Sequence, residues 1–227
     1  MKDLLSNLHI QVNENVYIKD PESSELGKRI IRGSISLLIE VGFDAFTFHK
    51  LAKEIQSTEA SVYRYFENKH KLLLYLFSWY WSWMEYKLVF ALANIESPKE
   101  RLGRAIEVLT REPEEDNVYG HINERQLNQI IIAESSKAYL TREVDEENKM
   151  GAFSAYKRLV GRVSEIVTEI SPEYKYPRMV ISTVIEGAHH QRFFASHLRS
   201  LTDVVVGEDS ITSFYKQMVM KSIESEK

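Results

Sequence analysis

Residues 46–72 read FTFHKLAKEIQSTEASVYRYFENKHKL and carry more information than the rest of the chain. Apolar residues recur at helical spacing on both sides of a polar break at Gln56-Ser57, which predicts two very short helices joined by a tight turn. Asn68 is a good N-cap and predicts the start of a longer helix. This layout is typical of a helix-turn-helix, in which the second short helix enters a DNA groove.

Local chemistry supports this layout residue by residue. Thr47 can cap the first short helix, and Thr58 or Ser57 can cap the second. The first helix is expected to turn an apolar face inward, made of Phe48, Leu51, Ala52 and Ile55. The second helix is expected to bury Val62 and Phe66. Its remaining side chains suit phosphate contact, stacking and base-edge reading, and they are Glu59, Ala60, Ser61, Tyr63, Arg64 and Tyr65.

These residues make the chain resemble the tetracycline-repressor (TetR) family of bacterial regulators over roughly residues 24–75. The matching positions are Gly42-Phe43, Phe46-Thr47, Leu51-Ala52, Thr58, Ser61-Val62-Tyr63, Tyr65-Phe66, Asn68-Lys69 and Leu72-Leu73. The resemblance implies an all-α fold with an N-terminal three-helix helix-turn-helix head. A long connector helix would join this head to a larger helical domain for ligand binding and dimerisation. The expected domains are an extension at 1–19, the head at 20–70 and the regulatory domain at 71–227.

The resemblance also implies roles for individual residues. Thr47 and Lys69 are expected to anchor phosphates, and Lys69 would lie at a positive helix terminus suited to an anion. His49, Glu59, Ala60 and Tyr63 lie where family members reach bases, and Ser61, Arg64 and Tyr65 lie where they meet backbone or base edges. The full expected DNA-binding set is Thr47, His49, Lys50, Thr58, Glu59, Ala60, Ser61, Tyr63, Arg64, Tyr65 and Lys69.

Two positions depart from the family pattern. The turn usually carries Gly and an apolar residue, whereas here it is Gln56-Ser57, so the turn either avoids positive φ or strains the Gln. Glu59 stands where Lys or Gln is common, which weakens the positive field of the recognition helix. Glu59 could accept a hydrogen bond from a cytosine amino group, or it could only interact with the helix dipole.

Composition narrows the class of protein. The chain has 227 residues, 44% of them hydrophobic, and can bury a sizeable core. Its formal net charge of −4 argues against binding polyanions over the whole surface, and no cysteine is present for a disulfide, a zinc knuckle or thiol redox sensing. No stretch approaches the ~20 apolar residues of a membrane span, and no signal peptide is evident, so a cytoplasmic protein is expected.

Helix signals dominate the rest of the chain. Asp20-Pro21 predicts a helix start, and Gly42 is expected to close that helix. A helix at about 68–94 is apolar on most of its circumference, as a connector between two bodies should be. A further helix ends near Thr110, and an acidic loop covers 111–120. Later helices are expected at 122–138, 142–170, 177–199 and 208–223. The run Val204-Val205-Val206 could adopt an extended backbone conformation.

Aromatic residues on the connector suggest a ligand pocket. The expected pocket residues are Trp79, Trp83, Tyr86, Glu186 and His190. For any individual ring, the pattern favours ordinary core packing of a large helical domain over a pocket. Glu186 and His190 are one helical turn apart, but nothing in the sequence completes a metal site, so neither a metal nor a cofactor is expected.

Two late helices carry heptad-like apolar seams. Against their symmetry mates they would form a four-helix dimer interface, made of Val180, Val184, Gly187, Gln191, Phe194, Leu198, Ile211, Tyr215 and Met218. Packing within one chain predicts the same pattern. The family resemblance favours the dimer, since an operator with two half-sites needs a two-fold protein.

The sequence therefore predicts a homodimeric, sequence-specific transcriptional regulator, most simply a repressor. Its expected partners are double-stranded operator DNA and an unknown small-molecule inducer. No association with a membrane is expected. No Gly-rich phosphate loop, no Cys nucleophile and no acid–base pair fixed by spacing is present, so an enzyme is not expected. The alternative is a helical protein-interaction module that keeps the helix-turn-helix shape without binding DNA, which Glu59 and the barely positive charge balance of residues 44–75 favour.

Overall fold

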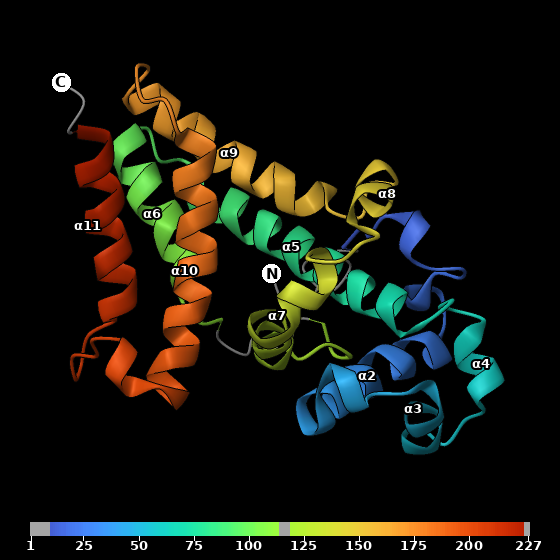
Figure 1. Ribbon diagram of the computed structural model, residues 1–227. Coiled ribbons are helices and arrows are strands. Elements are labelled where there is room, and N and C mark those ends of the chain that lie inside the picture. Colours follow the sequence, from blue (N-terminus) through green and yellow to red (C-terminus); the bar gives the residue numbers. More distant parts are fainter. Residues whose placement is uncertain (1–9, 114–118, 225–227) are drawn as a thin grey trace. The chain divides into compact units, whose positions relative to one another are not determined.

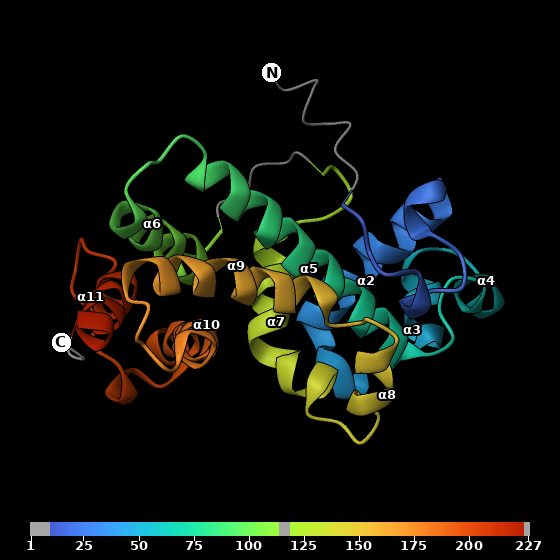
Figure 2. The same cartoon turned by 90° about the horizontal axis from the view of Figure 1, so that it is seen from above.

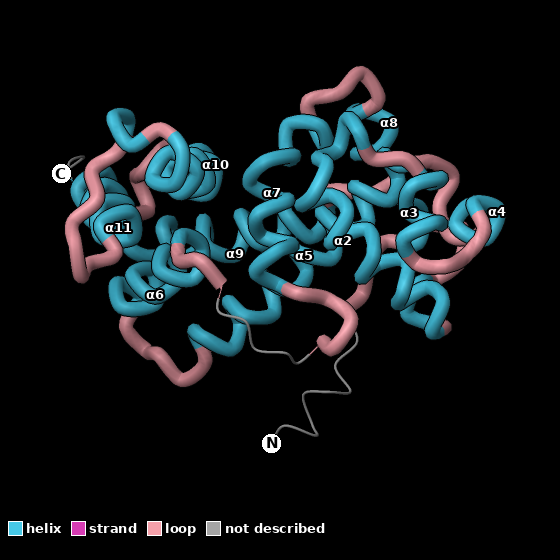
Figure 3. Tube along the Cα trace, turned by 90° about the horizontal axis from the view of Figure 1, so that it is seen from below, coloured by secondary structure: helices cyan, strands magenta, loops and turns pink. Residues whose placement is uncertain are grey.

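A computed structural model describes residues 10–113 and 119–224 of the chain. Within these residues the structure consists of helices and connecting loops (Figure 3). The expected all-α class is confirmed, with an N-terminal helix-turn-helix and a larger helical part (Figure 1). The first nine residues of the predicted extension and the middle of the predicted acidic loop lie outside the described residues.

The helices follow one another with short connections. In order they are η1 (Glu14–Val16), η2 (Pro21–Ser23), α2 (Glu25–Ala45), α3 (Phe48–Glu54), α4 (Glu59–Tyr63), α5 (Lys69–Leu92), α6 (Pro98–Thr110), α7 (Glu124–Tyr139), α8 (Val144–Lys149), α9 (Ser154–Ile170), α10 (Pro177–His197), η3 (Arg199–Leu201) and α11 (Ser210–Glu224).

The start of the first long helix differs from the prediction. Asp20 and Pro21 begin the single 3₁₀ turn η2, and α2 begins after a separate cap, Ser24, whose Oγ accepts from the Gly27 N–H at 3.1 Å. Gly42 interrupts the helical geometry of α2 at φ +70°, close to the predicted end.

One later expectation is wrong. The helix expected at 142–170 is divided into α8 and α9, because the chain turns at Gly151 with φ +85°. The run from Val204 to Val206 forms an exposed loop between η3 and α11 and is not part of a strand.

The chain packs into two compact units. Unit 1 consists of residues 1–82 and 112–155, and unit 2 consists of residues 83–111 and 156–227. The connector helix α5 therefore contributes its first part to unit 1 and its second part to unit 2. These units do not follow the boundaries at residues 20 and 70 that were drawn along the sequence, and those boundaries remain a prediction.

In unit 1, α7 lies beside α2, and the short helices α3 and α4 pack together next to α2 at an edge of the unit (Figure 2). Hydrogen bonds join α2 to α7 where α2 ends. The Phe43 N–H donates to Glu134 Oε1 at 3.0 Å, and Lys137 Nζ donates to Asp44 Oδ2 at 2.8 Å. The hydrogen bond from Lys137 lowers the pKa of Asp44. Buried apolar side chains fill the core, among them Ile30, Ile31, Leu38, Phe46, Leu51, Val62, Phe66 and Leu127.

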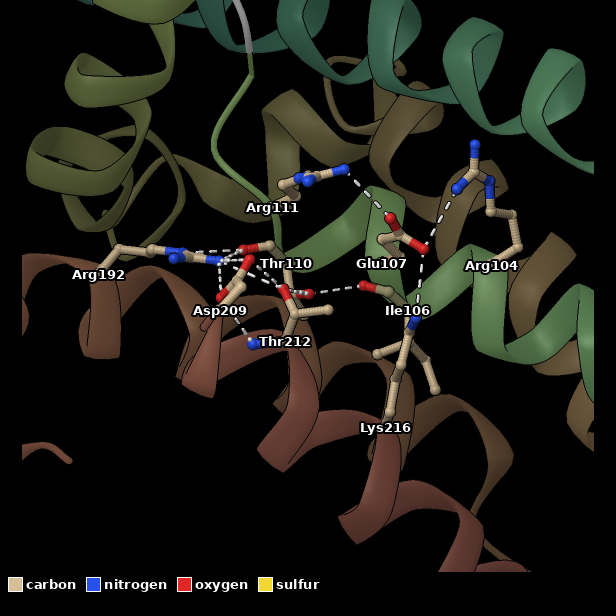
Figure 4. A network of polar contacts seen from close by, with 9 residues as sticks. All are labelled: Arg104, Ile106, Glu107, Thr110, Arg111, Arg192, Asp209, Thr212 and Lys216. Atoms are coloured by element: carbon tan, nitrogen blue, oxygen red, sulfur yellow. Dashed lines mark hydrogen bonds and ion pairs between the residues drawn. The ribbon is translucent and has the colours of Figure 1, made fainter. Parts of the chain in front are cut away.

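Unit 2 packs α6, α10 and α11 against one another. Arg192 on α10 joins the other two helices: its Nη2 donates to both carboxylate oxygens of Asp209 at 2.7 Å, and its Nε and Nη2 donate to the Thr110 carbonyl at 3.0 and 2.8 Å (Figure 4). Thr110 and Thr212 hydroxyls lie 2.8 Å apart in the same network. No helix in the described part of the chain is long and apolar enough to span a bilayer.

Candidate nucleic-acid interface

The first helix of the motif begins as the sequence predicts. Thr47 has extended backbone angles and its Oγ1 accepts from the Lys50 N–H at 3.2 Å, which makes it the N-cap of α3. Phe48, Leu51 and Ala52 are buried beneath the helix. The Thr47 and Lys50 side chains are exposed, and Lys50 Nζ donates to the Ala45 carbonyl at 2.8 Å.

The sequence allowed either a turn without positive φ or a strained Gln56, and the structure has the strained form. Gln56 has φ +51°, in the left-handed region that glycine usually occupies. The Ser57 N–H donates to the Ala52 carbonyl at 2.8 Å, and the Gln56 N–H donates to the Lys53 carbonyl at 3.2 Å. These bonds close the end of α3 in the manner of a Schellman motif.

The second helix, α4, presents a small exposed face at an edge of unit 1 (Figure 1). Thr58 caps it, since Thr58 Oγ1 accepts from the Ser61 N–H at 3.2 Å. Val62 is fully buried and fixes the helix to the core. Ala60, Tyr63 and Arg64 are exposed, whereas Glu59 and Ser61 are partly buried.

Tyr63 is the most prominent side chain of this face. It is 47% exposed, yet its ring packs edge-on against the Phe48 ring with centroids 5.0 Å apart. This contact restricts the rotamer of Tyr63, so the phenol is presented to solvent in a defined direction. Arg64 follows it as the C-cap residue of the helix and makes no ion pair with the described residues.

His49 and Glu59 form a loose pair beside α4. His49 Nδ1 lies 3.7 Å from Glu59 Oε2, and both side chains are accessible. The carboxylate of Glu59 is therefore on the surface, within reach of a partner, rather than buried by the helix terminus.

The prediction that Tyr65 contacts DNA is wrong. Its side chain is 2% exposed, and its hydroxyl lies 2.7 Å from Ser24 Oγ. The Tyr65 carbonyl accepts from the Ile18 N–H at 2.8 Å, so the segment before α2 is tied to the end of α4. Tyr65 lies beyond the last residue of α4, where the chain turns toward the core, and this turn carries the ring inward.

Lys69 also has a different role from the predicted one. Its Nζ donates to the carbonyls of Phe43, Asp44 and Phe46 at 2.9, 3.1 and 3.2 Å, and it lies 4.7 Å from the centroid of the Phe43 ring. Because an ammonium group has three N–H donors, all three are in use and none remains for a phosphate. Lys69 joins the start of α5 to the end of α2. Asn68 caps α5 as expected, with Oδ1 accepting from the Lys71 N–H at 2.9 Å.

The five residues expected to line a ligand pocket are not gathered into one packing unit. Trp79 belongs to unit 1, where its ring contacts Tyr119, and the other four belong to unit 2. Trp83 is buried beneath Lys87, and Glu186 Oε1 accepts from the Tyr156 hydroxyl at 2.8 Å. His190 is exposed and stacks on Phe194. Tyr86 is half-buried, and its hydroxyl has no hydrogen-bond partner among the described residues.

Four of the residues expected at a dimer interface are buried within one chain instead. These are Val180, Val184, Ile211 and Tyr215. A Cβ at Gly187 would collide with the Tyr215 hydroxyl, so the small residue makes room for packing of α11 on α10 inside the chain. Helical spacing predicts the same row of apolar residues whether α10 and α11 pack within one chain or against a second copy. Gln191, Phe194, Leu198 and Met218 keep accessible surface, and Leu198 is 47% exposed.

Two arginines that the sequence analysis did not single out lie beside the turn. Arg29 Nη2 donates to the Ile55 carbonyl at 3.1 Å, and Arg32 Nη2 donates to the Gly120 carbonyl at 2.9 Å. Their spacing of three along α2 places them on one face, opposite the buried Ile30 and Ile31. That spacing is the signal from which they could have been found. No group of His, Asp or Glu suited to a metal ion occurs among the described residues.

Comparison with known families places this geometry among bacterial regulators. Residues 30–76 match the family model described as bacterial regulatory proteins, tetR family. This segment contains α3, α4 and the start of α5. Comparison with curated protein sequences gives no match.

Solved structures share the fold at low sequence identity. The fatty acid degradation regulator FadR from Bacillus halodurans is 15% identical, with a TM-score of 0.61 over 88% of this chain and 95% of that one. AibR, in complex with isovaleryl coenzyme A and operator DNA, is 17% identical, with a TM-score of 0.57 over 84% and 97%. The superantigen PfiT is 14% identical, with a TM-score of 0.58 over 92% and 100%. At such identities the likeness concerns the fold alone.

Proposed function

We propose that this chain, a member of the tetR family of bacterial regulatory proteins by its residues 30–76, is a sequence-specific DNA-binding repressor that a small molecule releases from a palindromic operator. The observation that carries the proposal is the exposed face of α4. Ala60 and Tyr63 are exposed on a five-residue helix whose opposite face is anchored by the fully buried Val62, and the cap residue Arg64 is exposed directly after them. A short rigid helix with an aromatic and a cationic side chain facing water suits the major groove.

Two classes of contact follow from this geometry. Tyr63 and Arg64 are the proposed base readers, and Glu59 accepts from a cytosine amino group. Thr47, Lys50, Thr58 and Ser61 are accessible around them and are proposed to meet backbone phosphates, together with His49. Phosphate contacts fix the register of the protein on the duplex, and the base readers supply the sequence preference.

We also propose that the chain works as a homodimer, through the outer faces of α10 and α11. Large apolar side chains are exposed there, and they include Met179, Phe193, Leu198 and Phe214. An exposed apolar face of this kind on a helix pair favours association with a second copy. A two-fold dimer would present two α4 helices to two half-sites.

Release by a ligand requires a molecule with different affinity for the DNA-bound and DNA-free states. The hydroxyl of Tyr86 in unit 2 is buried and has no hydrogen-bond partner in the described part of the chain, which supports a polar contact to such a ligand. AibR is found with both isovaleryl coenzyme A and operator DNA. Acyl coenzyme A thioesters are therefore the first compounds to test for release.

A protein-interaction module is the second candidate. Lys50 and Lys69 both direct their ammonium groups at backbone carbonyls, which leaves fewer free cations near α4 than a DNA reader of this fold would be expected to offer. PfiT, described as a superantigen, has a similar fold. An interaction module predicts no specific DNA complex and no dependence on salt.

The deciding experiment is fluorescence anisotropy of the full chain with duplexes from upstream of its own coding region, over a salt series. Specific binding with a log–log salt slope of several units supports the regulator. Tyr63→Ala and Arg64→Ala should each weaken specific binding by roughly tenfold, from lost base contacts. The control is Arg142→Gln, since Arg142 is exposed between α7 and α8. Equal, weak binding to all duplexes would favour the interaction module.

A further inference from the structure

A surface groove in unit 1 lies between α2 and the turn of the helix-turn-helix. It encloses about 390 Å³, and it is lined by residues of α2 and by the segment from Glu54 to Gln56. Gly33 and Ile55 form its apolar floor, because Gly33 is buried and approaches the Ile55 side chain closely. The walls carry polar and charged side chains.

Two guanidinium groups are held in place at this groove. Arg29 and Arg32 each use Nη2 on a backbone carbonyl, at 3.1 and 2.9 Å respectively. A guanidinium has five N–H donors, so each arginine keeps further donors for a ligand. The carbonyl bonds also reduce the rotamer freedom that a free surface arginine would lose on binding, so the pair is preorganised.

Neutral donors complete the wall. Ser36 and Gln56 line the groove with exposed side chains that make no hydrogen bond to the described residues. Gln56 has φ +51°, and this backbone conformation fixes the direction from which its side chain leaves the turn. Gln56 is two residues before Thr58, the cap of α4, so the groove adjoins the start of the proposed recognition helix.

We propose that this groove binds a phosphate group through Arg29, Arg32, Ser36 and Gln56. Planar guanidinium forks match the oxygen geometry of phosphate, and hydroxyl and amide donors add hydrogen bonds without charge. The inference deepens the proposed DNA binding and rests on it in one respect: the source of the phosphate is then the operator backbone next to the bases that α4 reads. The same chemistry would also accept the phosphate of a small molecule.

Glu54 provides a test in which phosphate binding should become stronger. Its exposed carboxylate lines the same groove and opposes an anion, so it lowers the net charge of the site from +2 to +1. Glu54→Gln removes this repulsion with little change of volume. It should therefore strengthen phosphate binding, whereas an arginine substitution weakens it, and a variant that binds more tightly cannot owe its effect to misfolding.

The test uses the full chain and two probes. Inorganic phosphate is titrated at constant ionic strength, with chloride as the reference anion, and thermal unfolding is followed. The operator duplex is titrated by anisotropy over a salt series. The variants are Arg29→Gln with Arg32→Gln, Glu54→Gln alone, and Arg142→Gln as the control, which removes one exposed cation outside the groove.

If the backbone of the operator is the source, the double variant should weaken operator binding about fivefold and reduce the salt slope by about 1 for each bound head. Glu54→Gln should strengthen it by a similar factor, and Arg142→Gln should leave it unchanged. If only the phosphate-dependent shift in Tm responds to the variants, the site stands and the source is a small phosphorylated molecule.

The proposal is overturned if neither probe distinguishes the double variant and Glu54→Gln from the control. Failure of the proposed function is separate from this result. A wild-type chain that binds no duplex specifically would remove the DNA role, while the phosphate titration would still decide whether the groove is an anion site.

Discussion

The Tyr65 hydroxyl and Ser24 Oγ lie 2.7 Å apart, which joins the end of the proposed recognition helix to the cap of the first long helix. Ser24 also caps α2 by accepting from the Gly27 N–H. The position of α4 therefore depends on a residue far away in the sequence. Tyr65 acts as part of the support for the DNA-binding face, not as part of the face itself.

Removing the hydrogen bond between Tyr65 and Ser24 should lower the stability of the fold without changing the preferred operator sequence. Tyr65→Phe should lower the free energy of unfolding by about 1 kcal/mol, since one partly buried hydrogen bond is lost. Ser24→Ala should cost about 1–2 kcal/mol, because the helix cap is lost as well. Urea unfolding measures both, and the double variant should be less destabilised than the sum of the two. A change of preferred operator in Tyr65→Phe would mean that Tyr65 reads DNA after all.

Lys69 should prove to be a structural residue. Lys69→Met leaves three carbonyls without their charged donor and should lower the free energy of unfolding by about 2 kcal/mol. The salt slope of operator binding should stay unchanged, because the wild-type ammonium makes no phosphate contact. Lys53→Gln is the matched control, since Lys53 is exposed on α3. A loss of about one unit of salt slope in Lys69→Met, without loss of stability, would restore its role as a phosphate anchor.

What the sequence predicts well depends on local chemistry. Thr47, Thr58 and Asn68 cap the helices as expected, because a cap is formed by residues three positions apart. Tyr65 and Lys69 were misassigned because their partners, Ser24 and the end of α2, are brought to them only by folding. The groove at Arg29 was missed for the same reason, since its other wall is the turn at Gln56.

The apolar seams of α10 and α11 show a second limit. Heptad spacing identifies which side chains share a face, but it does not say whether the neighbour is the same chain or a second copy. In the structure Tyr215 is 5% exposed and packs inside the chain, whereas the adjacent Phe214 is 55% exposed. Tyr215 therefore belongs to the seam inside the chain, and Phe214 belongs to the outer face of α11.

Substitution of these neighbours should separate folding from assembly. Phe214→Glu should dissociate the proposed dimer with little change in the stability of the monomer, because it places a charge on the outer face. Tyr215→Ala should lower the free energy of unfolding by about 3–4 kcal/mol through a cavity beside Gly187. Sedimentation velocity reports the first effect and urea unfolding the second. A Phe214→Glu variant that stays dimeric would place the interface elsewhere.

His189 should make the stability of the chain depend on pH. Burial lowers its pKa to about 4, from an ordinary value near 6.5, with a smaller contribution from His190. Between these values the unfolded chain binds a proton that the folded chain does not, so stability falls as pH falls from about 6.5 toward 4. The loss approaches roughly 3 kcal/mol at the acid end of this range, since one unit of pKa corresponds to about 1.4 kcal/mol.

Two neighbouring histidines provide the variant and the control for this dependence. His189→Gln should flatten the fall in unfolding free energy between pH 7 and pH 5, whatever its effect at pH 7, because the titrating group is gone. His190→Gln removes only the smaller contribution to the lowered pKa of His189, so the slope should stay close to that of the wild type. Urea unfolding at several pH values in one buffer series measures both slopes. Equal slopes in the wild type and His189→Gln would mean that other groups carry the acid sensitivity and that His189 is protonated as readily in the folded chain as in the unfolded one.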